Sequence, residues 1–260
     1  MTLIFQNRHV LVTGGGRGIG AAIASQFAAL GASLSLIGRN KKVLEEKAAE
    51  LNGEFGIHVF SYSADVSDHA QVIEAFDAAE NQHGQIEFLI NNAGQVESAP
   101  FSKTTSELWR KMVGINLDGV YFGTSYVIPK MLESGFGRVV NIASTAGLTG
   151  YRYVSAYCAA KHGVVGFTKA LALETAGKGI TVNAVCPGYT DTDLVSEAAG
   201  VIAGKTQQTV EEIKQGFVKG IPQGRFVRPQ EVAAAVSWLC EDSQGSITGA
   251  TINISGGEIL

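Results

Sequence analysis

The sequence predicts an α/β fold in which helices cover both faces of a parallel sheet. Short runs of β-branched residues alternate with longer segments of helical period along the whole chain. These short runs are almost entirely apolar, as in strands that are buried on both faces. Glycine is the compositional outlier, with 32 glycines against five prolines in 260 residues, which indicates many tight turns between strands and helices.

Seven strands and six helices are expected in alternation. The expected strands are His9–Thr13, Ser33–Ile37, His58–Ser61, Phe88–Asn91, Arg138–Ile142, Thr181–Val185 and Thr251–Ile254. The expected helices are Gly18–Leu30, Lys41–Asn52, Asp68–His83, Ser106–Glu133, Val154–Ala176 and Gln230–Glu241. No linker rich in proline or serine interrupts this order, so residues 1–260 are predicted to form a single doubly wound (Rossmann) domain with a seven-stranded parallel sheet.

One stretch departs from the alternation. Residues 188–224 carry no strand pattern and lie between the sixth strand and the last helix. A compact domain seldom keeps such a long irregular insert unless the insert covers a site. We therefore expect a substrate lid at about 188–224; the alternative is a helical excursion on the surface.

Composition excludes several classes of function. The formal net charge of −4 leaves no broad cationic surface for nucleic acid. No apolar run approaches the roughly 18–20 residues of a membrane span and no leader pattern is evident, so a cytoplasmic protein without membrane contact is expected. Cys158, Cys186 and Cys240 are odd in number and lack C-x-x-C spacing, so neither a disulfide framework nor a metal site is expected.

A glycine-rich turn joins the first strand to the first helix, with the sequence Thr13-Gly14-Gly15-Gly16-Arg17-Gly18-Ile19-Gly20. A pyrophosphate must approach bare backbone N–H groups at a helix N-terminus, where any side chain would block it. Two patterns fit, G-x-G-x-x-G/A at Gly16, Gly18 and Ala21, or G-x-x-x-G-x-G at Gly14, Gly18 and Gly20. The position after the first strand of a βαβ unit predicts a dinucleotide site.

The choice of dinucleotide depends on the end of the second strand. An acidic residue there would bind the ribose 2′-hydroxyl of NAD. The sequence instead reads Gly38-Arg39-Asn40, and no carboxylate follows before Glu45. Arg39 and Arg17 could bracket a 2′-phosphate with charge-assisted hydrogen bonds, which favours NADP(H) over NAD; the alternative is that both are solvated surface charges.

A tyrosine and a lysine share one face of the fifth expected helix, because Tyr157 and Lys161 are four residues apart. An ammonium about 5 Å from a phenolate stabilises it by roughly 3 kcal/mol at an effective dielectric of ~20, which is about two pKa units. Tyr157 is therefore expected to exchange protons at about pH 7–8. Ser144, at the end of the fifth strand, could donate to a carbonyl oxygen on which negative charge grows.

Together these features resemble the short-chain dehydrogenase/reductase family over nearly the whole chain. The segments that carry the resemblance are Thr13–Gly20, Asp65-Val66, Asn91-Asn92-Ala93-Gly94, Asn116, Ser144, Tyr157 with Lys161, and Pro187-Gly188. One segment departs from the pattern, because Ser255-Gly256-Gly257 lacks the acid that many relatives have before the paired glycines.

The resemblance implies a role for each matching residue. Asp65 and Val66 would contact the adenine, and the turn Asn92-Ala93-Gly94 would border the adenosine ribose. Pro187 and Gly188 would back the nicotinamide, with Thr192 near its carboxamide. Lys161 would bind the nicotinamide ribose and, through a water held by Asn116, belong to a proton relay. Ser144, Tyr157, Lys161 and Asn116 would form the catalytic set.

Several segments look like those of bacterial 3-ketoacyl-thioester and polyketide ketoreductases. The resemblance implies an NADPH-dependent carbonyl reductase that acts on a 3-oxoacyl thioester or a related cyclic or aromatic ketone, as a homotetramer or dimer. One alternative is an NAD-linked secondary alcohol, 3-hydroxyacid or 3-hydroxyacyl-CoA dehydrogenase that works oxidatively, since 3-hydroxybutyrate dehydrogenases share the Lys161–Gly166 run. Another is a catalytically silent NADPH-binding regulator.

Overall fold

The computed structural model describes residues 3–204 and 206–259, which fold around one parallel sheet. Met1, Thr2, Lys205 and Leu260 lie outside the described residues, Lys205 within the expected lid. The described chain contributes seven strands, in the spatial order β3-β2-β1-β4-β5-β6-β7. They are β1 (His9–Thr13), β2 (Ser33–Gly38), β3 (Val59–Ser63), β4 (Phe88–Asn91), β5 (Gly137–Ile142), β6 (Ile180–Pro187) and β7 (Thr251–Ile254).

The doubly wound prediction is confirmed by the order of the strands. The chain runs outward from β1 to β3, returns to the other side of β1, and continues through β4 to β7. β1 therefore pairs with both β2 and β4, in the registers His9↔Ser33 and Val10↔Phe88. This reversal separates the loops above β1 and β4 and opens a crevice at the carboxyl ends of the strands.

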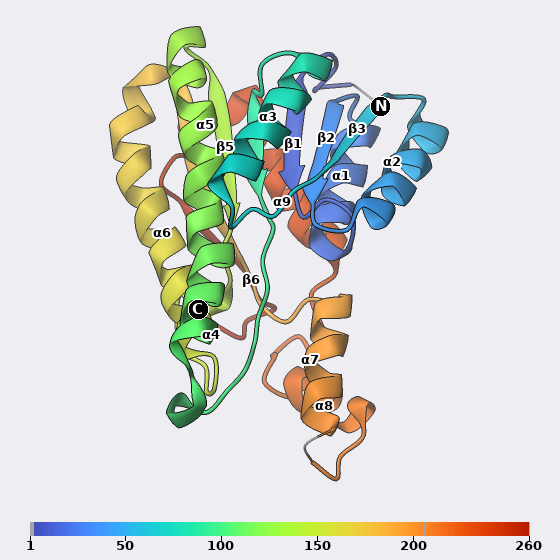
Figure 1. Ribbon diagram of the computed structural model, residues 1–260, viewed down its shortest axis with the longest axis vertical. Helices are drawn as coiled ribbons and strands as arrows, with labels where there is room; N and C mark the ends of the chain where they lie inside the picture. The colour runs from blue at the N-terminus through green and yellow to red at the C-terminus, as the bar shows by residue number, and fades with distance from the viewer. Residues whose placement is uncertain (1–2, 205, 260) are drawn as a thin grey trace.

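Helices form a layer on each face of the sheet (Figure 1). The helices of the described chain are α1 (Gly18–Ala29), α2 (Lys41–Phe55), α3 (His69–His83), α4 (Ser106–Val113), α5 (Gly119–Ser134), α6 (Ser155–Thr175), α7 (Asp193–Ala203), α8 (Val210–Val218) and α9 (Pro229–Cys240). α1, α2 and α9 bury apolar side chains such as Phe27 and Val236 on one face. α3, α5 and α6 bury Phe76, Val127 and Ala172 on the other. No helix in the described ranges is both long and apolar enough for a membrane crossing.

The helix expected over Ser106–Glu133 is interrupted. α4 ends at Val113, a π-helical turn occupies Gly114–Asp118, and α5 begins at Gly119. A Cβ on Gly119 would lie 2.9 Å from Val66 Cγ2, so the chain here presses against the loop after β3. A π turn adds only one residue to the helical repeat, so the spacing of apolar residues is nearly the same before and after it. For this reason the helical period predicted one continuous helix.

The stretch after β6 is helical rather than irregular. α7 and α8 occupy most of residues 193–218 and project beyond the carboxyl edge of the sheet, as α4 does on the other side (Figure 1). An aromatic contact joins the two ends of this segment. The rings of Tyr189 and Phe217 are stacked, with their centroids 4.6 Å apart. The segment thus differs in secondary structure from the expected irregular insert, and its role as a substrate lid stays a prediction.

β1 begins with a buried histidine. His9 is fully buried; its Nδ1 is 2.8 Å from the carbonyl oxygen of Gly84 and its Nε2 is 2.9 Å from Ser35 Oγ. The neutral ring satisfies both contacts if Nδ1–H donates to the carbonyl and Nε2 accepts from the hydroxyl. Burial lowers the pKa of His9 from 6.5 to about 4.

The stability of the fold is therefore expected to fall in mild acid. Below pH 6.5 the unfolded chain takes up a proton at His9 while the folded chain does not, so the free energy of unfolding decreases as the pH falls toward 4. Between pH 7 and 4.5 this loss amounts to about 2–3 kcal/mol. Urea unfolding of the wild type and His9→Gln at both pH values measures it; equal pH dependence in the two proteins would contradict the assignment.

Candidate active site

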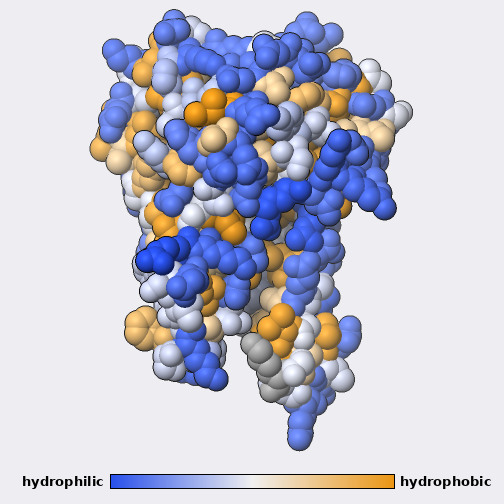
Figure 2. Space-filling view, viewed as in Figure 1, coloured by the Kyte–Doolittle hydropathy of each residue, from blue (hydrophilic) through white to orange (hydrophobic). Residues whose placement is uncertain are grey.

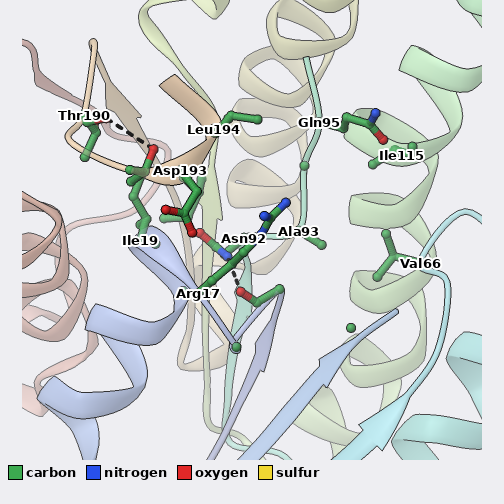
Figure 3. Close-up of a pocket in the computed structure, with 18 of the residues that line it drawn as sticks. Arg17, Ile19, Val66, Asn92, Ala93, Gln95, Ile115, Thr190, Asp193 and Leu194 are labelled. Carbon is green, nitrogen blue, oxygen red and sulfur yellow. Dashed lines mark hydrogen bonds between the residues drawn. The ribbon is translucent and has the colours of Figure 1, made fainter. Parts of the chain in front are cut away.

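A cleft of about 490 Å³ lies at the carboxyl ends of the strands, where the strand order reverses. Its walls come from the glycine turn before α1, from the ends of β2 to β6, and from the start of α7. Figure 3 shows Arg17, Asp193 and Leu194 on one side of this cleft, with Val66 and Ile115 across it. The position and size suit a small-molecule or cofactor site.

The predicted site residues converge on this cleft, with the exception of Asn116. Those that line it are Gly14, Gly16, Arg17, Gly18, Ile19, Gly20, Arg39, Asp65, Val66, Asn92, Ala93, Gly94, Ser144, Tyr157, Lys161, Pro187, Gly188 and Thr192. They come from segments spread over 179 positions of the chain, from Gly14 to Thr192, so the fold itself assembles them.

The glycine turn has the geometry of a phosphate cradle. Gly14 and Gly18 adopt positive φ angles of 67° and 56°, and a Cβ on Gly20 would lie 2.1 Å from the carbonyl oxygen of Gly14. These constraints fall on the glycines of the pattern G-x-x-x-G-x-G, namely Gly14, Gly18 and Gly20. They therefore favour this pattern over G-x-G-x-x-G/A, which ends at Ala21. Within the described chain, no side chain caps the first turn of α1, which leaves its N–H groups and the positive end of the helix dipole for an anion. The residues present therefore fit the pyrophosphate of a dinucleotide.

The turn after β4 holds the glycine turn in place. Asn92 Nδ2 donates to the carbonyl oxygens of Thr13 and Gly14 at 2.9 and 3.2 Å. In return, Thr13 Oγ1 accepts from the backbone N–H groups of Asn92 and Ala93, both at 3.0 Å. The segment that the family resemblance places beside the ribose thus also fixes the shape of the phosphate cradle.

A methyl group at Gly20 is expected to disrupt this cradle. In Gly20→Ala the Cβ collides with backbone of the turn, so we expect at least roughly tenfold weaker dinucleotide binding and a loss of about 1–3 kcal/mol in the free energy of unfolding. Fluorescence titration and urea unfolding measure the two effects. Gly53→Ala is the matched control, because a Cβ there meets nothing within 4 Å in α2 and should leave binding unchanged.

Both predicted arginines line the cleft, in different surroundings. Arg39 follows β2, and its Nη2 is 3.5 Å from Gln95 Oε1. Arg17 Nη1 donates at 2.8 Å to Glu197 Oε1 of α7, an ion pair that the sequence analysis did not anticipate. Both side chains of this pair are more than half exposed, so it contributes little to stability.

Three of the four residues predicted to be catalytic line the cleft together, namely Ser144, Tyr157 and Lys161. Ser144 follows β5, where its Oγ accepts from the backbone N–H of Ala146 at 3.1 Å, leaving its own proton free to donate elsewhere. Tyr157 and Lys161 lie one turn apart on α6. The Lys161 ammonium is buried, donates to the carbonyl oxygen of Ile142 at 2.8 Å, and lies 5.8 Å from the centre of the Tyr157 ring.

The acidities of these groups differ from the expectation. Burial raises the pKa of Tyr157 to about 12, although a hydrogen bond with Ser144 acts in the opposite direction. Burial also lowers the pKa of Lys161 to about 8. The prediction of a tyrosine that titrates near pH 7–8 is therefore wrong for the chain alone, because burial of the phenol dominates its pKa.

Asn116 lies behind the cleft rather than in it. It is fully buried in the π turn, its Nδ2 donates to the carbonyl oxygens of Gln95 and Met112, both at 2.9 Å, and its Oδ1 accepts from the N–H of Gln95 at 3.1 Å. A Cβ on Gly94 would lie 3.0 Å from this Oδ1 and 3.7 Å from Lys161 Nζ. The side chain thus positions the segment after β4, and its part in a proton relay stays a prediction.

Sequence reasoning missed part of the lining. The additional residues are Gly38, Asn40, Val43, Leu44, Ala64, Gln95, Ile115, Ile142, Ala143, Thr190, Asp193, Leu194 and Val195. Several of them directly precede or follow the end of a strand, and that position alone could have identified Gly38, Ala64 and Ala143. The apolar residues of α7 carry no comparable signal, because any surface helix shows the same pattern.

Comparison with known proteins identifies the class. Residues 8–200 match the model of the short chain dehydrogenase family. The chain therefore belongs to the short-chain dehydrogenase/reductase family and is an oxidoreductase that acts on carbonyl or hydroxyl groups.

Particular relatives are similar over nearly their whole length. The chain is 41% identical over 249 residues to the granaticin polyketide synthase putative ketoacyl reductase 1 of Streptomyces violaceoruber, covering 95% of this chain and 91% of that protein. It is 40% identical over 252 residues to the acetoacetyl-CoA reductase of Rhizobium meliloti, covering 97% and 98%. A crystal structure of an actinorhodin polyketide ketoreductase variant with NADPH superposes with a TM-score of 0.93 at 36% identity, covering 96% and 97%.

Proposed function

We propose that the protein is an NADPH-dependent carbonyl reductase that converts a ketone to a secondary alcohol. The observation that carries this proposal is the single cleft in which Ser144, Tyr157 and Lys161 lie together with the glycine turn. When bound, the reduced nicotinamide would supply the hydride. The similarity to ketoacyl and acetoacetyl-CoA reductases supports the reductive direction.

The chain's own residues supply the proton and stabilise the charge. Ser144 would donate its hydroxyl proton in a hydrogen bond to the carbonyl oxygen of the substrate, where negative charge develops. Tyr157, whose pKa is raised to about 12, is protonated at neutral pH and can transfer its proton to the alkoxide, a stronger base than a phenolate. The ammonium of Lys161, 5.8 Å from the ring centre, then stabilises the phenolate that remains.

The oxidative alternative would use the same residues in the opposite direction, with Tyr157 as the base. The similarity to ketoacyl and acetoacetyl-CoA reductases, rather than the acidity of Tyr157, favours reduction. A silent NADPH-binding regulator, in turn, has no use for a serine, a tyrosine and a lysine that converge on one cleft.

The preference for NADP(H) is proposed from the end of β2. Arg39 lines the cleft at the position where an NAD enzyme would have a carboxylate, and Arg17 lines it from the glycine turn. The structural neighbour solved with NADPH supports this assignment.

Reversal of the charge at Arg39 is expected to reverse the preference. Arg39→Asp should weaken NADPH binding by about 2 kcal/mol, or roughly 30-fold, because a charged hydrogen bond to the 2′-phosphate is lost and repulsion is added. Affinity for NADH should hold or improve. Titration of the cofactor fluorescence measures both; equal weakening of the two dinucleotides would show that Arg39 does not contact the 2′-phosphate.

The proposed substrate is a 3-oxoacyl thioester or a related cyclic or aromatic ketone, small enough to enter beside Tyr157. Ile115, Leu194 and Val195 contribute apolar side chains to the lining of the cleft, and we propose α7 and α8 as its lid. Figure 2 shows a notch between the α7–α8 projection and the one that carries α4, which provides a way in. Turnover of a panel of ketones and 3-oxoacyl thioesters, with NADPH and with NADH, tests the function; absence of NADPH oxidation with every class would contradict it.

We also propose that the protein assembles as a homotetramer or dimer. Trp109, Tyr121 and Leu173, on α4, α5 and α6, are exposed although they are large and apolar. Burial of these side chains against a second copy of the chain would remove them from water. Light scattering coupled to size-exclusion chromatography measures the mass; a monomer at micromolar concentration would contradict the proposal.

A further inference from the structure

The guanidinium of Arg17 is shared between the cofactor cleft and the lid. Arg17 lines the cleft, yet its Nη1 donates to Glu197 Oε1 at 2.8 Å. Glu197 lies on α7, one turn beyond Asp193 and Leu194, which line the same cleft. The ion pair therefore joins the glycine turn to a helix that is 180 positions away in sequence.

The position of Glu197 is set by close packing. α7 starts directly against the glycine turn, because a Cβ on Gly18 would lie 3.3 Å from Thr192 Cγ2. The helix therefore holds the carboxylate of Glu197 beside Arg17. Because the side chains are 58% and 57% exposed, another anion can replace this carboxylate without disturbing the core.

We propose that Glu197 is a specificity-determining residue, which competes with the 2′-phosphate of NADP(H) for Arg17 and so limits the preference for NADP(H) over NAD(H). The inference rests on the proposed cofactor. A guanidinium binds phosphate best through two parallel N–H bonds, and the bond to Glu197 occupies one of these donors. The carboxylate also repels a phosphate bound beside it. NADH has no 2′-phosphate and experiences neither effect.

Glu197→Gln tests the competition, because it removes the charge and keeps the length of the side chain. The dissociation constants of NADPH and NADH are measured by fluorescence titration, and those of adenosine 2′,5′-bisphosphate and 5′-AMP by calorimetry. We expect about three- to tenfold tighter binding of the two phosphate-bearing ligands. The other two should change less than about twofold. Glu211→Gln is the matched control, since Glu211 lies on α8 and forms no ion pair with another described residue.

A double variant shows whether the effect passes through Arg17. In an Arg17→Gln background, Glu197→Gln should no longer tighten NADPH binding. Unchanged affinity of Glu197→Gln for NADPH would overturn the inference. Equal weakening of NADPH and NADH binding would also overturn it, because the ion pair would then serve only to hold α7 in place.

The proposed function fails in a different way. If Arg17→Gln and Arg39→Asp both weaken NADPH and NADH alike, the assignment of the 2′-phosphate to these arginines is wrong. If they weaken NADPH alone while Glu197→Gln has no effect, the cofactor assignment stands and only the role of Glu197 is refuted.

Discussion

Tyr157→Phe is expected to reduce the turnover of ketone substrates by roughly 10²–10⁴-fold, the usual contribution of a positioned general acid. The substitution removes only the hydroxyl, so the ring still packs on α6 beside Ser144 and Lys161. Binding of NADPH should change less than about twofold, because the glycine turn and the adenosine end are untouched. Steady-state kinetics and cofactor titration separate the two quantities.

Tyr153→Phe provides the matched control. Tyr153 lies four residues earlier, is largely exposed and does not line the cleft, so loss of its hydroxyl should leave turnover unchanged. Equal activity of Tyr157→Phe and the wild type would remove the proposed mechanism. Loss of activity together with loss of NADPH binding would instead point to a structural role for the hydroxyl.

The sheet was predictable because its strands are short apolar runs with sharp ends. The bounds of β1, β4 and β7 coincide with the expected ranges His9–Thr13, Phe88–Asn91 and Thr251–Ile254. The break at Gly114–Asp118 was not predictable, since a π turn shifts the helical pattern by only one residue. Its cause is tertiary, because the chain must bring Asn116 against the backbone of Gln95.

The candidate site was predictable where the chemistry is local. Gly14, Gly18 and Gly20 are conformational requirements of a single turn, and Tyr157 and Lys161 share a face by spacing alone. Their acidities were not predictable in the same way. The pKa of Tyr157 depends on how much water the folded chain removes, and the sequence does not contain that quantity.

Contacts between distant segments were beyond the reach of sequence reasoning. Arg17 could be assigned to the cleft from its place in the glycine turn, but its partner Glu197 lies in a stretch without a recognisable pattern. The identity of this partner follows only from the packing of α7 against Gly18.

Lys161→Met is expected to lower turnover and raise stability at the same time. An ammonium 5.8 Å from the ring centre stabilises the phenolate by about 3 kcal/mol at an effective dielectric of ~20, so its removal should slow turnover roughly 10²-fold. Burial of this charge is unfavourable, as the fall in the pKa of Lys161 to about 8 shows. A methionine should therefore raise the free energy of unfolding at pH 7 by about 1–3 kcal/mol, after the loss of the hydrogen bond to Ile142.

The pH profile distinguishes this electrostatic role from a structural one. As the pH rises through about 8, Lys161 loses its proton and the phenolate loses its stabilising charge, so kcat/KM for ketone reduction should fall in the wild type. In Lys161→Met the value should be low at every pH, without a decline near pH 8. Lys169→Met, an exposed lysine on the same helix, should retain the wild-type profile. A variant Lys161→Met that is both inactive and less stable would show that the ammonium supports the fold, and the assignment of its charge to catalysis would then be wrong.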